Sequence, residues 1–333
     1  MGELADRRAE TGARIAQLRD RLKEAAALAE GKACVYATGS FGRCEASPHS
    51  DLDLFILGKS DGPTGARRKA GSLLRRLDEI CIKADLIEAT RALNIQEFSG
   101  DGRYLTHYSV HELTKTLGTP EDDVMNTFTA RLLLLLESCP LLGSAVYGEV
   151  TQEVVAAYWR DYEDHKTGFM PAFLTNDILR LWRTFCVNYE ARTERVPDEE
   201  KAKGKLKNYK LKHSRLLTCY SALLYLLAVY SLRGTVSPAD AMEMVGLTPT
   251  GRLEWLLDQA GLARAHGKAG ELLAQYERFL ETTNAEEKDL VRRMMDKEIS
   301  QIYMGAAYKF GDLVFEVLTS IGNGNRFHRL MVV

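Results

Sequence analysis

The chain has 333 residues, a formal net charge of −2 and nearly equal numbers of basic (44) and acidic (46) side chains. This balance excludes a strong overall attraction to nucleic acid or to an anionic membrane, so any basic site must be local. The six cysteines are scattered without a C-x-x-C pair, and the charged N-terminus has no apolar signal core. We therefore expect a protein of the reducing cytoplasm without a disulfide framework.

The N-terminal region begins with a helical pattern followed by a strand. Residues 4–29 carry apolar side chains at helical spacing, with charges at the other positions. Residues 33–37 form an apolar run of strand length, which stops just before Gly39 and Ser40. We expect an amphipathic helix, a buried strand and a tight turn.

A second strand is predicted at residues 51–57, where polar and apolar side chains alternate. Asp51 and Asp53 fall on one face of this strand. The other face is apolar and consists of Leu52, Leu54 and Ile56. Both carboxylates therefore point to the same side.

A helix and a third strand are predicted to follow. Residues 67–80 have apolar side chains at helical spacing, and residues 81–87 alternate in a way that is typical of a strand. Asp85 lies on the polar side of that strand. We expect it to join Asp51 and Asp53 as the third carboxylate of one site. Glu88 is the alternative, less favoured because it shares the face of Ala84 and Leu86.

Helical patterns dominate the chain after about residue 115. We therefore expect an α+β domain at residues 1–115 and an all-helical domain at residues 116–333. The most apolar stretch, residues 216–232, is only 17 residues long and contains polar side chains. This composition favours a buried helix over a membrane span.

Two aspartates separated by one residue on a strand are suited to bind divalent metal ions. Strand alternation projects both side chains to one side about 6 to 7 Å apart, and Mg²⁺ prefers carboxylate and phosphate oxygens. Two such ions about 4 Å apart can activate a hydroxyl and hold a triphosphate. A glycine before the strand allows close approach of a phosphate, and serine and backbone amides can bind its oxygens.

The order of these features resembles the DNA polymerase β-like nucleotidyltransferase superfamily. The motif reads strand, Gly-Ser, ten residues, Asp-Leu-Asp-Leu, helix and then a strand with one aspartate. The sequence GSFGRCEASPHSDLD is similar in particular to the branch that contains the PII-uridylyltransferase N-terminal domain. The resemblance covers residues 30–90 and implies a small mixed sheet with a two-metal site.

The resemblance assigns roles to residues of the motif. It implies that Asp51, Asp53 and Asp85 bind two Mg²⁺ ions, with Mn²⁺ able to substitute. It also implies that Gly39 and Ser40 hold the phosphates of a nucleoside triphosphate.

Two further residues of the motif are candidates for phosphate contacts. Arg43 and Ser50 lie between the Gly-Ser pair and the second aspartate. Arg43 can equally form an ion pair with Glu45, and both interpretations stay open.

A local basic run at residues 201–215 contains six lysines, one histidine and one arginine. A solvated surface explains most of such a run, but cations from a helical domain can also bind a triphosphate. We expect Asn208, Lys210 and Arg215 to contribute to nucleotide binding. Because Tyr209 lies among the cations, the run could alternatively follow a nucleic-acid strand.

The sequence thus predicts an enzyme that transfers a nucleoside monophosphate from an NTP or dNTP to a hydroxyl and releases pyrophosphate. The acceptor is a nucleotide or oligonucleotide, a protein side chain or tRNA. Such an enzyme suits antiphage defence or a toxin system with a cognate regulatory or effector protein. The rival interpretation is a catalytically silent nucleotide-binding module with the same fold. Base, sugar and oligomeric state are left open.

Overall fold

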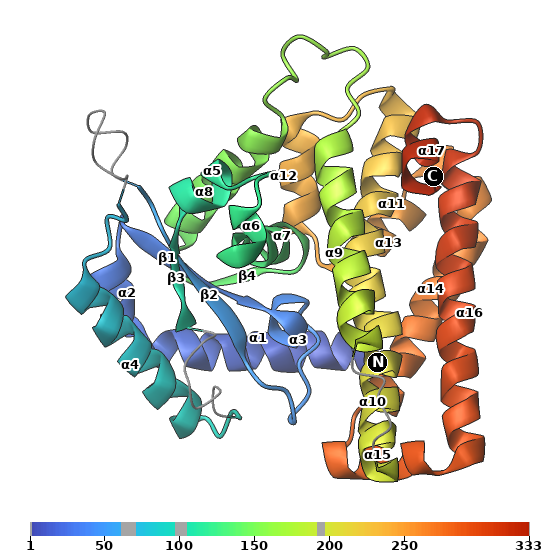
Figure 1. Ribbon diagram of the computed structural model, residues 1–333, viewed down its shortest axis with the longest axis horizontal. Coiled ribbons are helices and arrows are strands. Elements are labelled where there is room, and N and C mark those ends of the chain that lie inside the picture. The colour runs from blue at the N-terminus through green and yellow to red at the C-terminus, as the bar shows by residue number, and fades with distance from the viewer. Residues whose placement is uncertain (1, 61–70, 97–104, 192–196, 333) are drawn as a thin grey trace. The chain divides into compact units, whose positions relative to one another are not determined.

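A four-stranded mixed sheet forms the centre of the N-terminal part of the chain (Figure 1). Its strands are β1 (Ala33–Thr38), β2 (Asp53–Gly58), β3 (His107–Ser109) and β4 (Cys139–Leu142), in the spatial order β3-β2-β1-β4. β1 is antiparallel to both β2 and β4, whereas β3 is parallel to β2. The expected α+β class with a small mixed sheet is confirmed.

Helices cover one face of this sheet and enclose the main core. The predicted N-terminal helix forms as α1 (Glu3–Arg21) and α2 (Lys23–Ala29), and α4 (Arg76–Ala92) packs beside α2. Their apolar side chains bury the alternating apolar residues of β1 and β2 in one continuous cluster. Burial of this apolar face is the main reason why the strand alternation could be read from the sequence.

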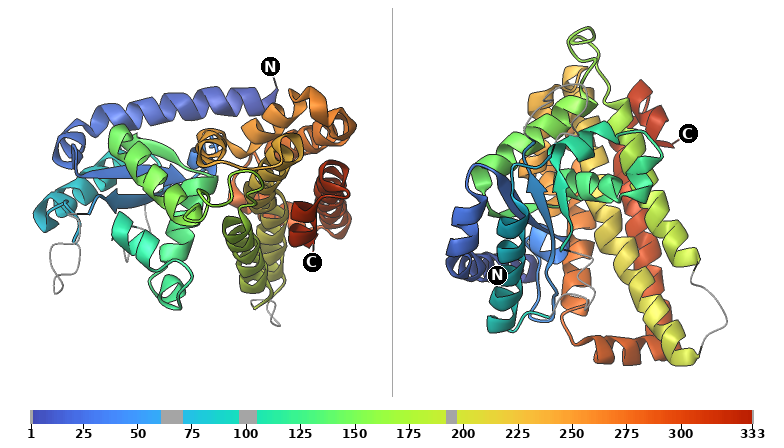
Figure 2. Two further views of the ribbon diagram at one scale, coloured as in Figure 1. Left: turned by 90° about the horizontal axis from the view of Figure 1, so that it is seen from above. Right: turned by 60° about the vertical axis from the view of Figure 1, so that its left-hand side comes forward.

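Other helices lie on the opposite face of β1, so this central strand is buried along its whole length. They are α7 (Thr127–Leu136) and α8 (Ser144–Tyr158). The Tyr36 side chain points to them and donates its hydroxyl to the carbonyl oxygen of Ala130, at 3.0 Å. Figure 2 shows the long α1 on one side of the strands and the green helices on the other.

The strand predicted at residues 81–87 is wrong, and within the described residues the helix predicted at 67–80 forms only from Arg76 onward. Residues 61–70 lie outside the described part, and residues 76–92 form the single helix α4. Ile82 and Leu86 are both fully buried, while Ala84 between them is exposed. This is the i, i+4 pattern of a helix, and in a short window it also resembles strand alternation.

The chain divides into two compact units, Glu3–Tyr158 and Trp159–Val333. The predicted boundary at residue 115 falls inside the first unit. The reason is that β4 returns to the sheet after α5 (Val110–Lys115), α6 (Glu121–Val124) and α7, and it pairs with β1. The structure describes residues 2–60, 71–96, 105–191 and 197–332.

The second unit is helical in its described part, as expected. Its helices are α9 (Ala172–Glu190), α10 (Asp198–Lys210), α11 (Leu216–Arg233), α12 (Pro238–Gly246), α13 (Pro249–Leu257), α14 (Ala263–Thr282), α15 (Glu287–Met295), α16 (Lys297–Gly322) and α17 (Arg326–Val332). A π-helical segment, Leu211–Arg215, joins α10 to α11.

The continuous helix Asp198–Arg233 is long and apolar enough to cross a membrane by length and composition alone. However, 72% of its apolar window is buried inside the structure. Most residues of α11 are buried, and the helix contacts other helices of the unit. These contacts are those of a core helix.

Candidate functional site

The turn after β1 brings Gly39 against the start of β2. Gly39 has φ +62°, in the left-handed region that favours glycine. A Cβ at this position would lie 2.8 Å from Oδ2 of Asp53, which is closer than such contacts allow. The glycine therefore permits both the backbone conformation and the close approach of the Asp53 carboxylate.

The two aspartates of the motif occupy the start of β2. Asp53 is the first residue of the strand and pairs with Thr38 of β1, while Asp51 precedes the strand and is exposed. Leu52 between them is 3% exposed and belongs to the core. Because side chains alternate at this point, both carboxylates project away from the core.

Three buried charged side chains, Arg43, Glu45 and Glu137, form an ionic network that contacts the Gly39 turn. Glu137, directly after α7, accepts the Gly39 N–H with Oε1 at 3.2 Å. Its Oε2 accepts from Nη1 of Arg43 at 2.7 Å, and Nε of Arg43 donates to Glu45 at 2.9 Å. The three charged side chains are at most 8% exposed. Removing one member of such a buried pair leaves an uncompensated charge.

This network confirms the ion pair between Arg43 and Glu45, one of the two interpretations of Arg43. Its guanidinium forms ion pairs with Glu45 and Glu137 below the turn. We interpret it as the group that fixes the Gly39 turn in place. A direct contact between Arg43 and a nucleotide stays a prediction.

The two motif serines differ in their surroundings. Ser40 lies in the first turn of the short helix α3 (Gly39–Gly42) and is partly exposed. The Ser50 hydroxyl accepts the Ser47 N–H at 3.0 Å, and the Ser50 N–H donates to the Ser47 carbonyl oxygen at 3.0 Å. Ser50 therefore closes the turn that leads into β2. Phosphate contacts of both serines stay predictions.

Asp85 does not lie on the sheet. It is a partly exposed residue of α4, the helix that covers the Leu54 and Ile56 face of β2. Asp53 lies on the opposite face of that strand. The reason for assigning Asp85 to the carboxylate site is therefore lost, and the alternative, Glu88, is an exposed residue of the same helix.

The strand that does follow the helix is β3, which runs parallel to β2. Its residues His107, Tyr108 and Ser109 include no carboxylate. Tyr108 lies on the Asp53 side of the sheet, where its ring contacts that of Phe55 with centroids 6.2 Å apart. Within the described ranges, no group of three or more His, Cys, Asp or Glu side chains could hold a metal ion.

Asp51 and Asp53 nevertheless have the chemistry that a substrate-bound Mg²⁺ needs. Mg²⁺ is typically held by one or two carboxylates together with substrate phosphates and water, rather than by an all-protein cage. Two outward-pointing carboxylates beside a glycine turn fit that donor set. Asp51 and Asp53 would hold the ion.

The candidates in the helical unit surround the π-helical segment. Asn208 is 9% exposed, Lys210 is exposed at the end of α10, and the Arg215 guanidinium lies 5.5 Å from the centre of the Phe185 ring. π-helical turns are often found at functional sites. Nucleotide binding by these three residues stays a prediction.

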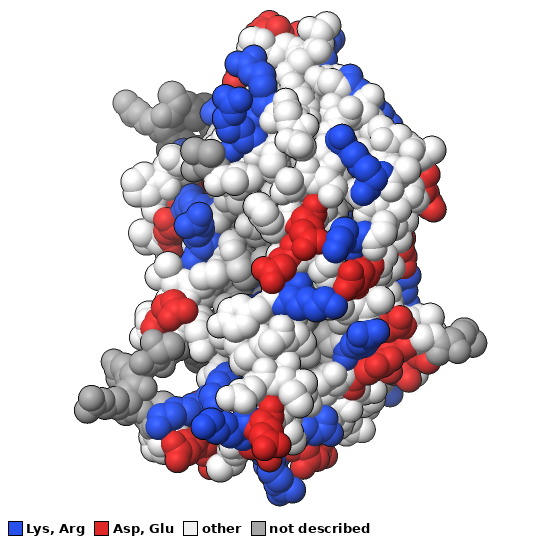
Figure 3. Space-filling model, turned by 90° about the vertical axis from the view of Figure 1, so that its right-hand side faces the viewer, with Lys and Arg blue, Asp and Glu red and all other residues white. Residues whose placement is uncertain are grey.

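The basic run at 201–215 is partly neutralised by acids of its own helix. Lys201 pairs with Asp198 at 2.9 Å and Lys203 pairs with Glu199 at 3.1 Å. Basic and acidic side chains are also interspersed on the molecular face of Figure 3. These pairs favour the interpretation of Lys201 and Lys203 as a solvated helix surface.

Glu137 is the residue of this site that sequence reasoning missed. It lies 98 positions after Gly39, so no local motif includes it. Its one signal is a charged residue directly after the apolar run LLLLL of α7. A charge at such a place is rarely buried unless it is paired.

The comparison with known families agrees with the geometry of the turn and strand. Residues 15–98 match the family model described as a nucleotidyltransferase domain. This segment contains Gly39, Asp51 and Asp53, and it ends before β3 and β4. No curated protein matches the chain.

Proposed function

We propose that the protein, whose residues 15–98 match the nucleotidyltransferase domain model, transfers a nucleoside monophosphate in a Mg²⁺-dependent reaction. The donor is an NTP or dNTP, the acceptor is a hydroxyl and pyrophosphate is released. The observation that carries the proposal is the approach of the Asp53 carboxylate to Gly39. It brings a carboxylate beside a turn whose backbone a phosphate can approach closely.

In this reaction different residues bind the metal, bind the phosphates and hold the Gly39 turn in place. Asp51 and Asp53 hold Mg²⁺, which when bound neutralises the triphosphate and polarises the reacting oxygens. Gly39 keeps the space beside Asp53 open, and Ser40 offers a hydroxyl to a phosphate oxygen. Glu137 and Arg43 hold the turn rigid, so the phosphate site is formed before the substrate binds.

We extend the proposal to the acceptor of the nucleotide and to the biological role of the protein. A nucleotide or oligonucleotide, a protein side chain and tRNA each provide a hydroxyl of the required kind. A role in antiphage defence or in a toxin system, with a protein partner that restrains or senses the enzyme, is compatible with each of them. Fold alone does not choose between these acceptors.

One observation favours a second candidate function, a catalytically silent nucleotide-binding module. The described strand β3 has no carboxylate beside β2. A site with two carboxylates can hold a metal–nucleotide complex without activating the acceptor hydroxyl. Binding and turnover must therefore be measured separately.

The test is incubation with each labelled NTP and dNTP in the presence of Mg²⁺ or Mn²⁺. We expect pyrophosphate release by the wild-type protein and a loss of at least about 100-fold in the Asp51→Asn/Asp53→Asn variant, because metal-held charge contributes several kcal/mol to such transition states. The control is Asp20→Asn, which changes an exposed aspartate of α1. It should retain full turnover.

Mass spectrometry of the small-molecule products, the protein and added tRNA identifies the acceptor in the same reaction. Nucleotide binding without turnover under every metal and acceptor condition would support the silent module. Equal turnover of the wild type and the double variant would refute the role of the two aspartates.

A further inference from the structure

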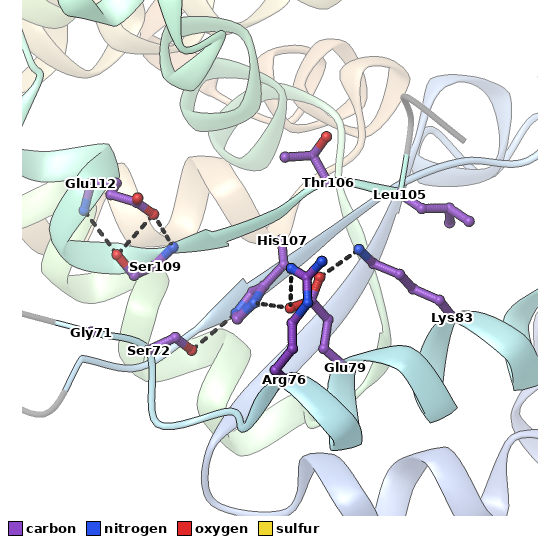
Figure 4. Close-up of a pocket in the computed structure, with 10 residues that line it drawn as sticks. All are labelled: Gly71, Ser72, Arg76, Glu79, Lys83, Leu105, Thr106, His107, Ser109 and Glu112. Carbon is purple, nitrogen blue, oxygen red and sulfur yellow. Dashed lines mark hydrogen bonds and ion pairs between the residues drawn. The ribbon is translucent and has the colours of Figure 1, made fainter. Parts of the chain in front are cut away.

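A second group of reactive side chains lies at the other end of β2. Ser72, Glu79 and His107 line a pocket of about 400 Å³, shown in Figure 4. His107 pairs with Ile56 in the parallel register and therefore faces the α4 side of the sheet. The pocket adjoins Gly58, five residues beyond Asp53 and roughly 17 Å along the strand. It is separate from the nucleotidyltransferase carboxylates.

The three side chains form a continuous hydrogen-bonded chain. The Ser72 Oγ lies 2.9 Å from Nε2 of His107, and Nδ1 of the same ring lies 3.2 Å from Oε2 of Glu79. The His107 and Glu79 side chains are 10% and 7% exposed, whereas Ser72 is more accessible. A nucleophile, a base and an orienting carboxylate in this order are the arrangement of a serine hydrolase.

The neighbouring groups fix where the protons lie. Burial alone would raise the pKa of Glu79, but the hydrogen bond and charge of Lys83, followed by His107, bring that pKa below its ordinary value. An ionised Glu79 can only accept, so Nδ1 of His107 carries the proton and Nε2 accepts. The Leu74 N–H donates to Ser72 Oγ at 3.1 Å. The Ser72 hydroxyl proton is therefore directed at Nε2.

The local backbone makes room for this contact. A Cβ on Gly58 would lie 2.0 Å from Ser72 Oγ and 2.8 Å from His107 Nε2. Only a glycine at this position of β2 allows the serine and the imidazole to meet. The pocket volume lies within the range of small-molecule sites.

We propose that Ser72 is the nucleophile of a second active site that hydrolyses small acyl esters. Ser72 Oγ attacks the carbonyl carbon while Nε2 of His107 takes the hydroxyl proton. The ester C–O bond then breaks, and His107 returns the proton to the departing alkoxide. Water, deprotonated by His107, attacks the acyl-serine, the carboxylic acid leaves and the proton returns to Ser72. Glu79 is a positioning residue that holds the ring.

A fluorophosphonate probe tests the nucleophile directly. Attack by Ser72 forms an O–P bond, breaks the P–F bond and releases fluoride, while His107 takes the proton. Peptide mass spectrometry of the full-length protein should find the adduct on Ser72. Labelling should be absent in Ser72→Ala and at least about 100-fold slower in His107→Gln, as expected when a general base is lost. Ser320→Ala, which removes a partly exposed serine of α16, should label like the wild type.

Hydrolysis of p-nitrophenyl acetate separates positioning from structure. In Glu79→Gln, we expect kcat to fall about 10-fold or more while KM stays unchanged, because the amide can still accept from Nδ1 but has lost its charge. Thermal unfolding of each variant shows whether it is folded. An adduct on another residue, no adduct on the folded wild type, or hydrolysis that persists in folded Ser72→Ala would each overturn the proposal.

Discussion

Gly39 and Asp53 lie so close that a single methyl group on the glycine would collide with the carboxylate. The hypothetical Cβ is 2.8 Å from Asp53 Oδ2 and 3.7 Å from the Asp53 Cβ. The glycine backbone is also in the left-handed region, with φ +62°. Position 39 therefore favours glycine for two reasons, its left-handed backbone and the close approach of the Asp53 carboxylate.

Replacing Gly39 by alanine should therefore impair the site and the fold together. The left-handed conformation costs an alanine about 1 to 2 kcal/mol, and a displaced Asp53 would leave the position from which we propose that it holds Mg²⁺. We expect a lower unfolding temperature and a loss of most of the pyrophosphate release. Gly148→Ala in α8 is the matched control, because nothing lies within 4 Å of its added Cβ. It should be neutral or slightly stabilising. Normal turnover by Gly39→Ala would contradict the assignment.

Glu137→Gln should destabilise the first unit strongly. The change leaves the buried Arg43 with one carboxylate partner fewer, and breaking such a pair costs about 3 to 5 kcal/mol. The free energy of unfolding can be measured by urea titration. The control Glu149→Gln removes a carboxylate that pairs with Lys59 at the surface, where the loss is at most about 1 kcal/mol. Equal effects of the two variants would show that the network is not needed.

Cys139 should react with iodoacetamide near neutral pH, unlike Cys34. A hydrogen bond from the Cys44 thiol, together with the charge of Arg19, lowers the Cys139 pKa to about 7. Burial raises the Cys34 pKa to about 12. Because the thiolate is the reactive form, the alkylation rate of Cys139 should rise with a midpoint near pH 7. Peptide mapping of the native protein measures it. A midpoint above about 8.5 would contradict the contact with Cys44.

His213 should make the helical unit sensitive to acid. Burial lowers its pKa from 6.5 to about 4, and its ring stacks on Phe279. Above pH 6.5 neither the folded nor the unfolded chain binds the proton. Below it the unfolded chain does, so stability falls between pH 6.5 and 4. The pKa difference corresponds to about 3 kcal/mol.

Urea titrations at pH 7, 6, 5 and 4.5 check this expectation. His213→Gln should be less stable at pH 7, because it loses the ring packing, but its stability should fall less on acidification than that of the wild type. An unchanged pH dependence in the variant would show that His213 titrates normally in the folded protein.

The sequence predicted the elements whose burial pattern is local. The N-terminal helix, β1 and β2 are amphipathic or apolar over their whole length, so their periodicity was sufficient. α4 was divided wrongly because Ile82 and Leu86 satisfy both a helical and a strand spacing in a short window. β4 has only four residues and depends on pairing with β1, far away in the chain. No local sequence pattern predicts a strand of this kind.

The residues of the candidate site, too, could be predicted only where they lie close together in the sequence. Gly39, Asp51 and Asp53 lie within 15 consecutive positions, so their spacing carries the chemistry. The assignment of Asp85 lost its basis because residues 81–87 belong to the helix α4 and not to a strand. Glu137 and the Ser72–His107 contact escaped because they join segments that only the folded sheet brings together.

The position of β4 has a practical consequence for anyone who wishes to express the first unit by itself. A fragment cut after residue 98 or 115 would lack β4 and Glu137. It would expose the hydrogen-bonding edge of β1, which invites aggregation, and it would bury Arg43 with one carboxylate partner fewer. A fragment that ends at Tyr158 retains both, and it is the shortest one whose boundaries follow the folding unit.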